Sequence, residues 1–190
     1  MVKVLILPGS ARRDSLNKKL AAVAAKFVQE AGAEADLVDP GDFRLPLFDQ
    51  DLEDAEGMPA PAKALKEKFL ARDAILFVSP EYNSSVTPLL KNIIDWVSRT
   101  ETDDEPSLAA YRGKVAGLLS ASPGALGGLR ALVHLRSILG NIGVLVVPRQ
   151  FALSSASDKF DASGNLTDAS AAKSARAVVE ELIAMATKLK

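Results

Sequence analysis

The chain has no cysteine and a single histidine among its 190 residues. Without cysteine it can form no disulfide, no thiol nucleophile and no iron–sulfur cluster. With one histidine it cannot build a metal site from several imidazoles. Reactions that depend on a thiol, a disulfide, an iron–sulfur cluster or a metal held by several histidines are therefore excluded.

The sequence also has no excess of charge of one sign and no long apolar run. It carries 23 basic and 24 acidic residues, for a formal net charge of −1. Such a balance predicts no general attraction to nucleic acid or to an anionic membrane. No apolar run reaches the length of a membrane span, and no signal-peptide pattern precedes the first apolar residues. We therefore expect a cytoplasmic protein without nucleic-acid binding or membrane insertion.

What is present begins with a strand, a polar loop and a helix start in direct succession. Residues 2–7 form an apolar run rich in β-branched residues, which is typical of a strand buried on both faces of a parallel sheet. Pro8 and Gly9 end that run, and Asp14 or Ser15 can cap the helix that follows.

The loop between the strand and the helix suits an anion, and we interpret it as a phosphate site. Backbone N–H groups, the positive end of a helix dipole, hydroxyls and Arg12 converge there. The loop has neither a Walker sequence nor the G-x-G-x-x-G dinucleotide pattern. The alternative is a polar loop whose serines only cap the helix.

The rest of the chain alternates between strands and helices. We expect an edge strand over 33–38 and an ordered, acidic surface loop over 39–57. The other strands are expected over 74–78, 114–120 and 144–147, and the helices over 15–31, 59–71, from Pro88 with Thr87 as its cap, 129–140 and 167–189. This pattern predicts one α/β domain over 1–190, with a doubly wound, five-stranded parallel sheet, helices on both faces and the flavodoxin-like strand order 2-1-3-4-5.

Two further polar loops follow the strands at 74–78 and 114–120. In the predicted strand order they meet the first loop at one edge of the sheet, where ligands bind in such folds. Glu81, Tyr82 and Asn83 could hold a flat ring by stacking and edge hydrogen bonds, although Tyr82 could also only cover the end of the sheet. The glycines of the 121–128 loop allow backbone to approach a ligand closely.

Together these loops resemble the NADPH-dependent FMN reductase family, which includes flavodoxin-like quinone, chromate and azo-dye reductases. The resemblance covers residues 2–150. One departure is Thr87-Pro88, where many members have Pro-Gly. The residues that carry the resemblance are Gly9-Ser10-x-Arg12-x-x-Ser15-x-Asn17, Pro80-Glu81-Tyr82-Asn83-x-Ser85, Leu90-Lys91-Asn92-x-x-Asp95-Trp96 and Ser122-x-Gly124-x-x-Gly127-Gly128.

The resemblance implies that bound FMN carries the chemistry, with no catalytic side chain. Electrons would pass from NADPH or NADH through FMN to a quinone by a ping-pong mechanism, with free flavin, azo dyes or chromate as further acceptors. The implied cofactor-binding residues fall into three sets. They are Ser10, Arg12, Ser15, Leu16 and Asn17 for the phosphate and ribityl chain, Pro80, Glu81, Tyr82, Asn83 and Ser84 for the isoalloxazine ring, and Ser122, Pro123, Gly124 and Gly127 for the other side of the ring.

Two other classes of function share this fold. A flavodoxin-like electron carrier would not oxidise NAD(P)H directly, and such carriers are usually strongly acidic. A phospho-acceptor domain needs an aspartate at the end of the third strand, where this chain has Ser79-Pro80.

The sequence also predicts a homodimer or homotetramer. The helix that carries Leu89 to Val97 has an apolar arc too wide for one core-facing stripe, so we expect part of it to face another subunit. His134 shares a helix face with Arg130 and Ser137. We interpret it as a surface or subunit-contact residue, with a catalytic role as the alternative.

Overall fold

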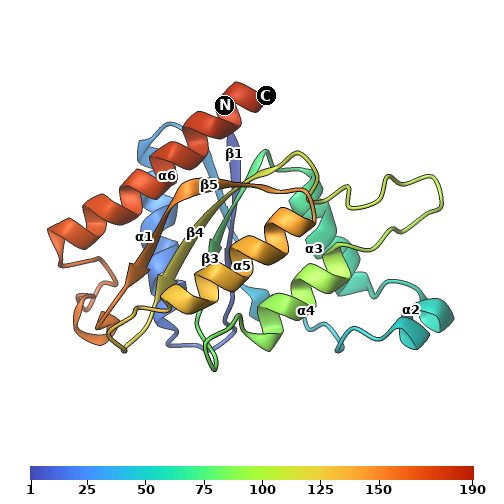
Figure 1. Ribbon diagram of the computed structural model, residues 1–190, viewed down its shortest axis with the longest axis horizontal. Coiled ribbons are helices and arrows are strands. Elements are labelled where there is room, and N and C mark those ends of the chain that lie inside the picture. The colour runs from blue at the N-terminus through green and yellow to red at the C-terminus, as the bar shows by residue number, and fades with distance from the viewer.

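The computed structural model describes all residues 1–190, and its five strands form one parallel sheet in the order β2-β1-β3-β4-β5 (Figure 1). This confirms the predicted fold class and strand order. The strands are β1 (Lys3–Pro8), β2 (Glu34–Leu37), β3 (Ala74–Val78), β4 (Val115–Ala121) and β5 (Leu145–Leu153).

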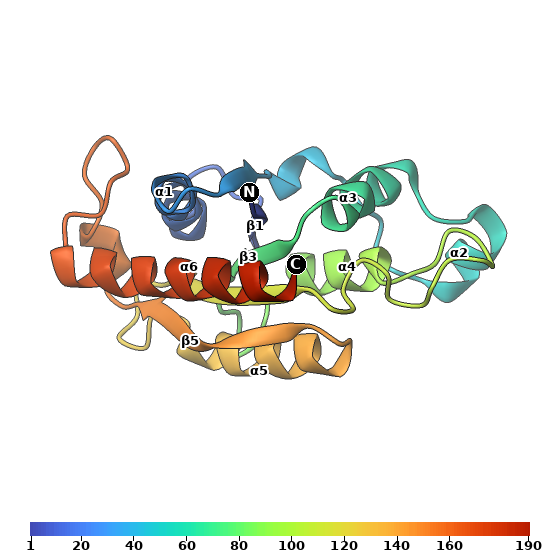
Figure 2. The same cartoon turned by 90° about the horizontal axis from the view of Figure 1, so that it is seen from above.

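The chain has six α-helices, and five of them, α1, α3, α4, α5 and α6, cover the two faces of the sheet. Figure 2 shows α1 on one side of the sheet and α3 and α4 on the other. The helices are α1 (Leu16–Glu30), α2 (Gln50–Glu56), α3 (Ala60–Leu70), α4 (Pro88–Val97), α5 (Leu129–Asn141) and α6 (Ala169–Leu189).

Two apolar clusters form the core, one on each face of the sheet. The side chains of β1 alternate between them: Val4 and Ile6 pack with α1 and α6, whereas Leu5 and Leu7 pack with α3, α4 and α5. A buried parallel strand needs apolar residues on both faces, which explains the nearly unbroken apolar run at the start of the chain, where only Lys3 is exposed.

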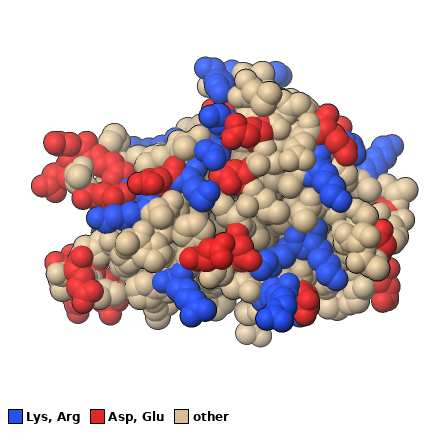
Figure 3. Space-filling model, turned by 180° about the vertical axis from the view of Figure 1, so that it is seen from behind, with Lys and Arg blue, Asp and Glu red and all other residues tan.

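Of the charged side chains, only that of Lys66 is buried, where it pairs with Glu105. On the face seen in Figure 3, basic and acidic residues are interspersed, as the net charge of −1 suggests. None of the helices combines the length and the apolar character that crossing a bilayer requires.

The segment 39–57 is more structured than the predicted surface loop. It contains a short 3-10 helix (Pro40–Asp42) and α2. Asp49 caps α2, because its carboxylate accepts a hydrogen bond of 2.9 Å from the N–H of Asp51. No residue of α2 is buried, so the sequence has no apolar periodicity that could have predicted this helix.

Strand β5 is also longer than the predicted 144–147. Its register with β4 shifts between Ala116 and Leu118, next to Pro148. Arg136 of α5 donates to the carbonyls of Val146 (3.3 Å) and Val147 (2.9 Å) at this irregularity. Proline is tolerated in edge strands and at bulges, and β5 is an edge strand with a bulge at this point.

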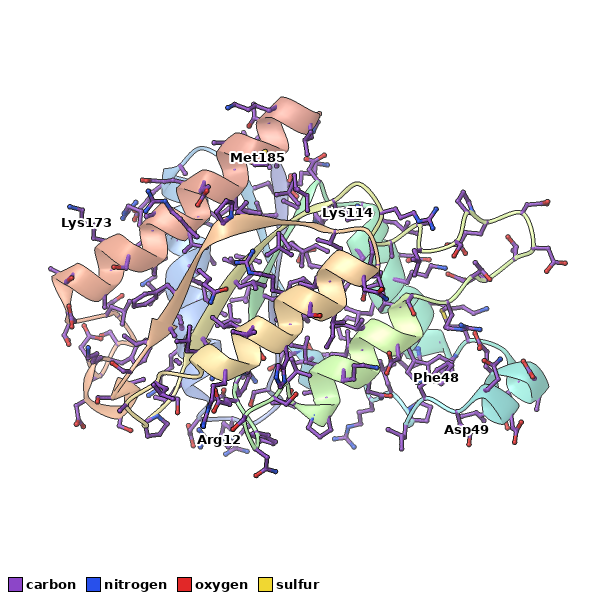
Figure 4. The ribbon with its side chains drawn as sticks, in the orientation of Figure 1. Arg12, Phe48, Asp49, Lys114, Lys173 and Met185 are labelled. Carbon is purple, nitrogen blue, oxygen red and sulfur yellow. The ribbon has the colours of Figure 1, made fainter.

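The wide apolar arc of α4 is covered by the chain itself. Trp96 is fully buried, and its indole N–H donates to the carbonyl of Pro46 at 2.8 Å. Phe48, labelled in Figure 4, packs edge-to-face on Trp96 with ring centroids 5.0 Å apart. Asn92 holds the same segment, since its side chain bonds to the backbone of Pro46 and Phe48.

Contacts within one chain therefore explain the buried part of this arc. A homodimer or homotetramer stays a prediction, and the apolar arc of α4 no longer supports it.

Candidate functional site

A cavity of about 150 Å³ lies at the carboxyl ends of β1, β3 and β4. The three polar loops line it, as the strand order predicts. All the predicted cofactor-binding residues line this cavity except Asn83, Ser84, Gly124 and Gly127, and Ala121 is a lining residue that the sequence analysis did not name. The lining residues are Ser10, Arg12, Ser15, Leu16, Asn17, Pro80, Glu81, Tyr82, Ala121, Ser122 and Pro123.

The first loop combines helix capping with free hydrogen-bond donors. The hydroxyl of Ser15 caps α1 by accepting the N–H of Lys18 at 3.4 Å, and that of Ser10 accepts the N–H of Arg12 at 3.3 Å. Each hydroxyl hydrogen can still donate to a ligand. The N–H groups of Leu16 and Asn17, in the first turn of α1, make no hydrogen bond within the chain. Capping and anion binding are therefore compatible here.

The electrostatics of the cavity favour an anion. Arg12 is the only cation among the lining residues, and Glu81 is the only anion. Glu81 is already paired with Arg130, so Arg12 has no acidic partner in the cavity. Figure 4 shows Arg12 at the edge of the molecule where the first turn of α5 lies.

Asn17 lines the cavity, but its side-chain amide serves the fold. The amide N–H donates to the carbonyl of Ala121 at 2.8 Å, and the amide oxygen accepts the N–H of Ala121 at 2.9 Å. This buried pair joins the start of α1 to the end of β4. These two bonds occupy one N–H and one lone pair of the amide, so the second amide N–H and the backbone N–H of Asn17 can still meet a ligand, and its cofactor-binding role stays a prediction.

The second loop is a tight hairpin. The N–H of Tyr82 bonds to the carbonyl of Ser85, and the N–H of Ser85 to the carbonyl of Tyr82, each at 3.0 Å. Asn83 and Ser84 form the tip with φ values of 50° and 67°, in the left-handed region. The tip does not reach the cavity wall, which explains why these two residues do not line it.

Tyr82 is the aromatic residue of the cavity wall. Its side chain is 56% exposed, so a ring face remains accessible to a planar ligand.

Glu81 is bound to the start of α5. Its carboxylate accepts hydrogen bonds from the Arg130 guanidinium (2.9 and 2.5 Å) and from the backbone N–H groups of Arg130 (3.1 Å) and Ala131 (3.3 Å). Burial alone would raise the pKa of Glu81, but these bonds outweigh it and hold the pKa below its ordinary value. The side chain predicted to line a ring is thus an ionised anchor.

The glycines of the third loop serve close packing. Gly127 has a φ of 62°, and a Cβ atom there would lie 2.7 Å from the backbone of Leu153. Gly128, with a φ of 91°, precedes the first turn of α5, where a Cβ atom would overlap the hydroxyl of Ser120. These positions need glycine for the fold, and Gly127 does not line the cavity.

The sequence model of NADPH-dependent FMN reductases matches residues 2–158. The chain belongs to this family. The resemblance seen in the loop motifs is thereby confirmed, as is the assignment of the chain as an oxidoreductase whose cofactors are FMN and NAD(P)H.

Individual proteins of known name agree with the assignment to the FMN reductases. An NAD(P)H-dependent FMN reductase of Pseudomonas aeruginosa is 38% identical over 168 residues, 88% of this chain and 85% of the relative. A quinone reductase of Escherichia coli is 37% identical over 146 residues, which cover 77% of this chain and 73% of the relative.

A solved structure agrees as well. The flavoenzyme NAD(P)H:(acceptor) oxidoreductase FerB of Paracoccus denitrificans superposes with a TM-score of 0.81 at 29% identity, over 99% of this chain and 98% of FerB.

Proposed function

We propose that this chain binds FMN in the cavity at the carboxyl ends of β1, β3 and β4 and passes electrons from NAD(P)H to a quinone by a ping-pong mechanism. When bound, FMN supplies the two-electron redox chemistry. The chain supplies the binding groups, their orientation and the electrostatic environment.

The observation that carries this proposal is the unpaired Arg12 beside the free N–H groups of the α1 start. The phosphate of FMN matches these donors, because a guanidinium fork and helix N-terminal N–H groups both favour a phosphate. The hydroxyls of Ser10 and Ser15 would add donors from the same loop.

The other residues that line the cavity suit a flat ring. They include Pro80 and Tyr82 from the second loop and Ser122 and Pro123 from the third. At about 150 Å³ the cavity is smaller than the roughly 300 Å³ at which ligand pockets begin. We infer that it holds the phosphate end, while the ring lies at the open mouth beside Tyr82. An open mouth would admit donor and acceptor in turn, which supports a ping-pong mechanism.

A quinone is the acceptor that the relatives support. The Escherichia coli relative is named a quinone reductase. Free flavin, azo dyes and chromate remain further candidate acceptors for the same site.

Binding and turnover test the proposal separately. Cofactor-free protein is titrated with FMN and with riboflavin, which lacks the phosphate, and binding is followed by flavin fluorescence. FMN should bind more tightly than riboflavin. Steady-state rates with NADH and NADPH against a panel of benzoquinones should then give parallel double-reciprocal lines.

A protein that takes up no FMN would contradict the proposal. FMN binding without NAD(P)H oxidation would indicate a flavodoxin-like electron carrier instead, and intersecting lines would refute the ping-pong order.

We also propose that residues 1–190 form a single FMN-binding domain that assembles as a homodimer or homotetramer. Leu126, Leu129 and Val133 are exposed around the first turns of α5 and are candidate contact residues. Light scattering at micromolar concentration tests this, and a monomeric mass would count against it.

A further inference from the structure

The Pro80–Ser85 loop is held by α5 at two points. At its beginning, the carboxylate of Glu81 accepts the four hydrogen bonds from Arg130 and Ala131 described above. At its end, the hydroxyl of Ser85 lies 2.9 Å from Nδ1 of His134. Arg130 and His134 are four residues apart and therefore lie on the same face of α5.

The loop between these two points turns through two left-handed residues. Asn83 and Ser84 both adopt left-handed backbone conformations without being glycine. This conformation is ordinary for asparagine in a two-residue hairpin turn, whereas for Ser84 it is unfavourable and is imposed by the contacts of the flanking residues. Apart from the two bonds between Tyr82 and Ser85 and the bond from the Ser79 hydroxyl to the carbonyl of Pro80, the hydrogen bonds of this loop go to α5.

We propose that Arg130 and His134 are positioning residues that hold the hairpin so that Pro80 and Tyr82 stand in the cavity wall. Glu81 acts as the anchor for this contact and does not bind the ligand. The proposal rests on the proposed function only in taking FMN as the ligand of that wall.

The geometry separates two contributions to flavin binding. Arg12 faces the phosphate end of the cavity, whereas Arg130 acts through Glu81 on the hairpin. Loss of Arg130 should therefore weaken the binding of FMN and of riboflavin by the same factor, because both ligands carry the isoalloxazine ring. Loss of Arg12 should weaken the binding of FMN and leave that of riboflavin unchanged.

The hairpin contact can be measured without any flavin. In the cofactor-free protein, amide hydrogen exchange at Tyr82 and Ser85 should be about fivefold faster in Arg130→Ala, since the pair is partly exposed and its loss corresponds to about 1 kcal/mol. His134→Ala should speed exchange at Ser85. Arg130→Lys and His134→Asn, which keep a charge and a polar atom respectively, should restore part of the protection.

A matched control is Arg149→Ala, which removes another surface Arg–Glu pair, that of Arg149 with Glu181. It should leave exchange at Tyr82 and Ser85 unchanged. Thermal unfolding of each variant checks that the fold is intact.

In flavin titrations, Arg130→Ala should weaken the binding of FMN and of riboflavin equally, by about two- to fivefold. It should also shift the visible circular dichroism of bound flavin, and Arg130→Lys should bring both effects part of the way back.

Unchanged exchange at Tyr82 and Ser85 in both alanine variants would overturn the proposal, whether or not the chain binds FMN. Faster exchange with unaltered flavin affinity and spectrum would overturn the positioning role. If the wild-type protein binds no flavin, the proposed function fails, while the exchange experiment still tests the contact between α5 and the hairpin.

Discussion

Replacement of Arg12 by alanine should weaken FMN binding about 10- to 30-fold and leave the fold intact. The guanidinium has no acidic partner among the residues that line the cavity, so its removal breaks no ion pair there. What is lost is a charge-assisted contact to the ligand. For an exposed side chain we place this contact at about 1.5–2 kcal/mol, and 1.4 kcal/mol is a factor of ten.

The assay compares FMN with riboflavin. Both are titrated into cofactor-free wild type, Arg12→Ala and the matched control Arg13→Ala, because Arg13 is the neighbouring arginine and does not line the cavity. Only the binding of FMN to Arg12→Ala should be weaker than that of the wild type. The loss should also shrink at high salt, since screening weakens the contribution of an exposed charge.

The reasoning would be refuted by an equal loss for FMN and riboflavin in Arg12→Ala, because Arg12 would then not act on the phosphate. An effect of Arg13→Ala as large as that of Arg12→Ala would refute it as well. It would show a general influence of positive charge in place of a specific contact.

Three further predictions concern stability. Asn17→Ala leaves the buried N–H and C=O of Ala121 without partners. It should lower the free energy of unfolding, measured by urea denaturation, by about 2–4 kcal/mol. A loss below about 1 kcal/mol would contradict the structural role of the amide. Gly127→Ala should lower the free energy of unfolding by more than about 1 kcal/mol, because the new Cβ atom would lie 2.7 Å from the backbone of Leu153. Gly140→Ala, on α5, should raise it by about 0.5–1 kcal/mol, because no atom lies within 4 Å of the new Cβ atom. The folded-state pKa of Glu81 lies below its ordinary value of 4.5, so its stabilisation is present above that pH and is lost as the pH falls through the folded-state pKa. The stability difference between wild type and Glu81→Gln should therefore be present at pH 7 and vanish in acid, and a constant difference would contradict the assignment.

Patterns that are local in the sequence predicted most of the fold. The apolar runs at 2–7 and 74–78 predict buried parallel strands because both faces of such strands need apolar side chains. Helix caps are similarly local, since the hydroxyls of Ser15 and Thr87 reach N–H groups only three residues ahead. Alternation of these elements then predicts the sheet order and the edge at which the loops meet.

Long-range partners were what the local patterns missed. The segment that covers Trp96 includes Pro46, 50 residues earlier. Nothing local to α4 indicates such a cover, so a surplus apolar face was interpreted as a subunit contact. Strand β5 was predicted too short for a related reason, because Arg136 of the preceding helix stabilises the backbone around Pro148.

The sequence by itself determined the class of fold, the edge of the sheet at which the three polar loops meet and the family of the enzyme. These depend on periodicity, on short turn and cap signals and on loop motifs, all of which involve neighbouring residues.

Only the tertiary structure decided what each polar side chain does at that edge. The amide of Asn17 bonds to the backbone of Ala121, and Glu81 bonds to Arg130, 49 residues away. A residue type states which hydrogen bonds it can make, but its actual partner depends on how distant parts of the chain pack. The same folding leaves Arg12 without an acidic partner in the cavity, available for a phosphate.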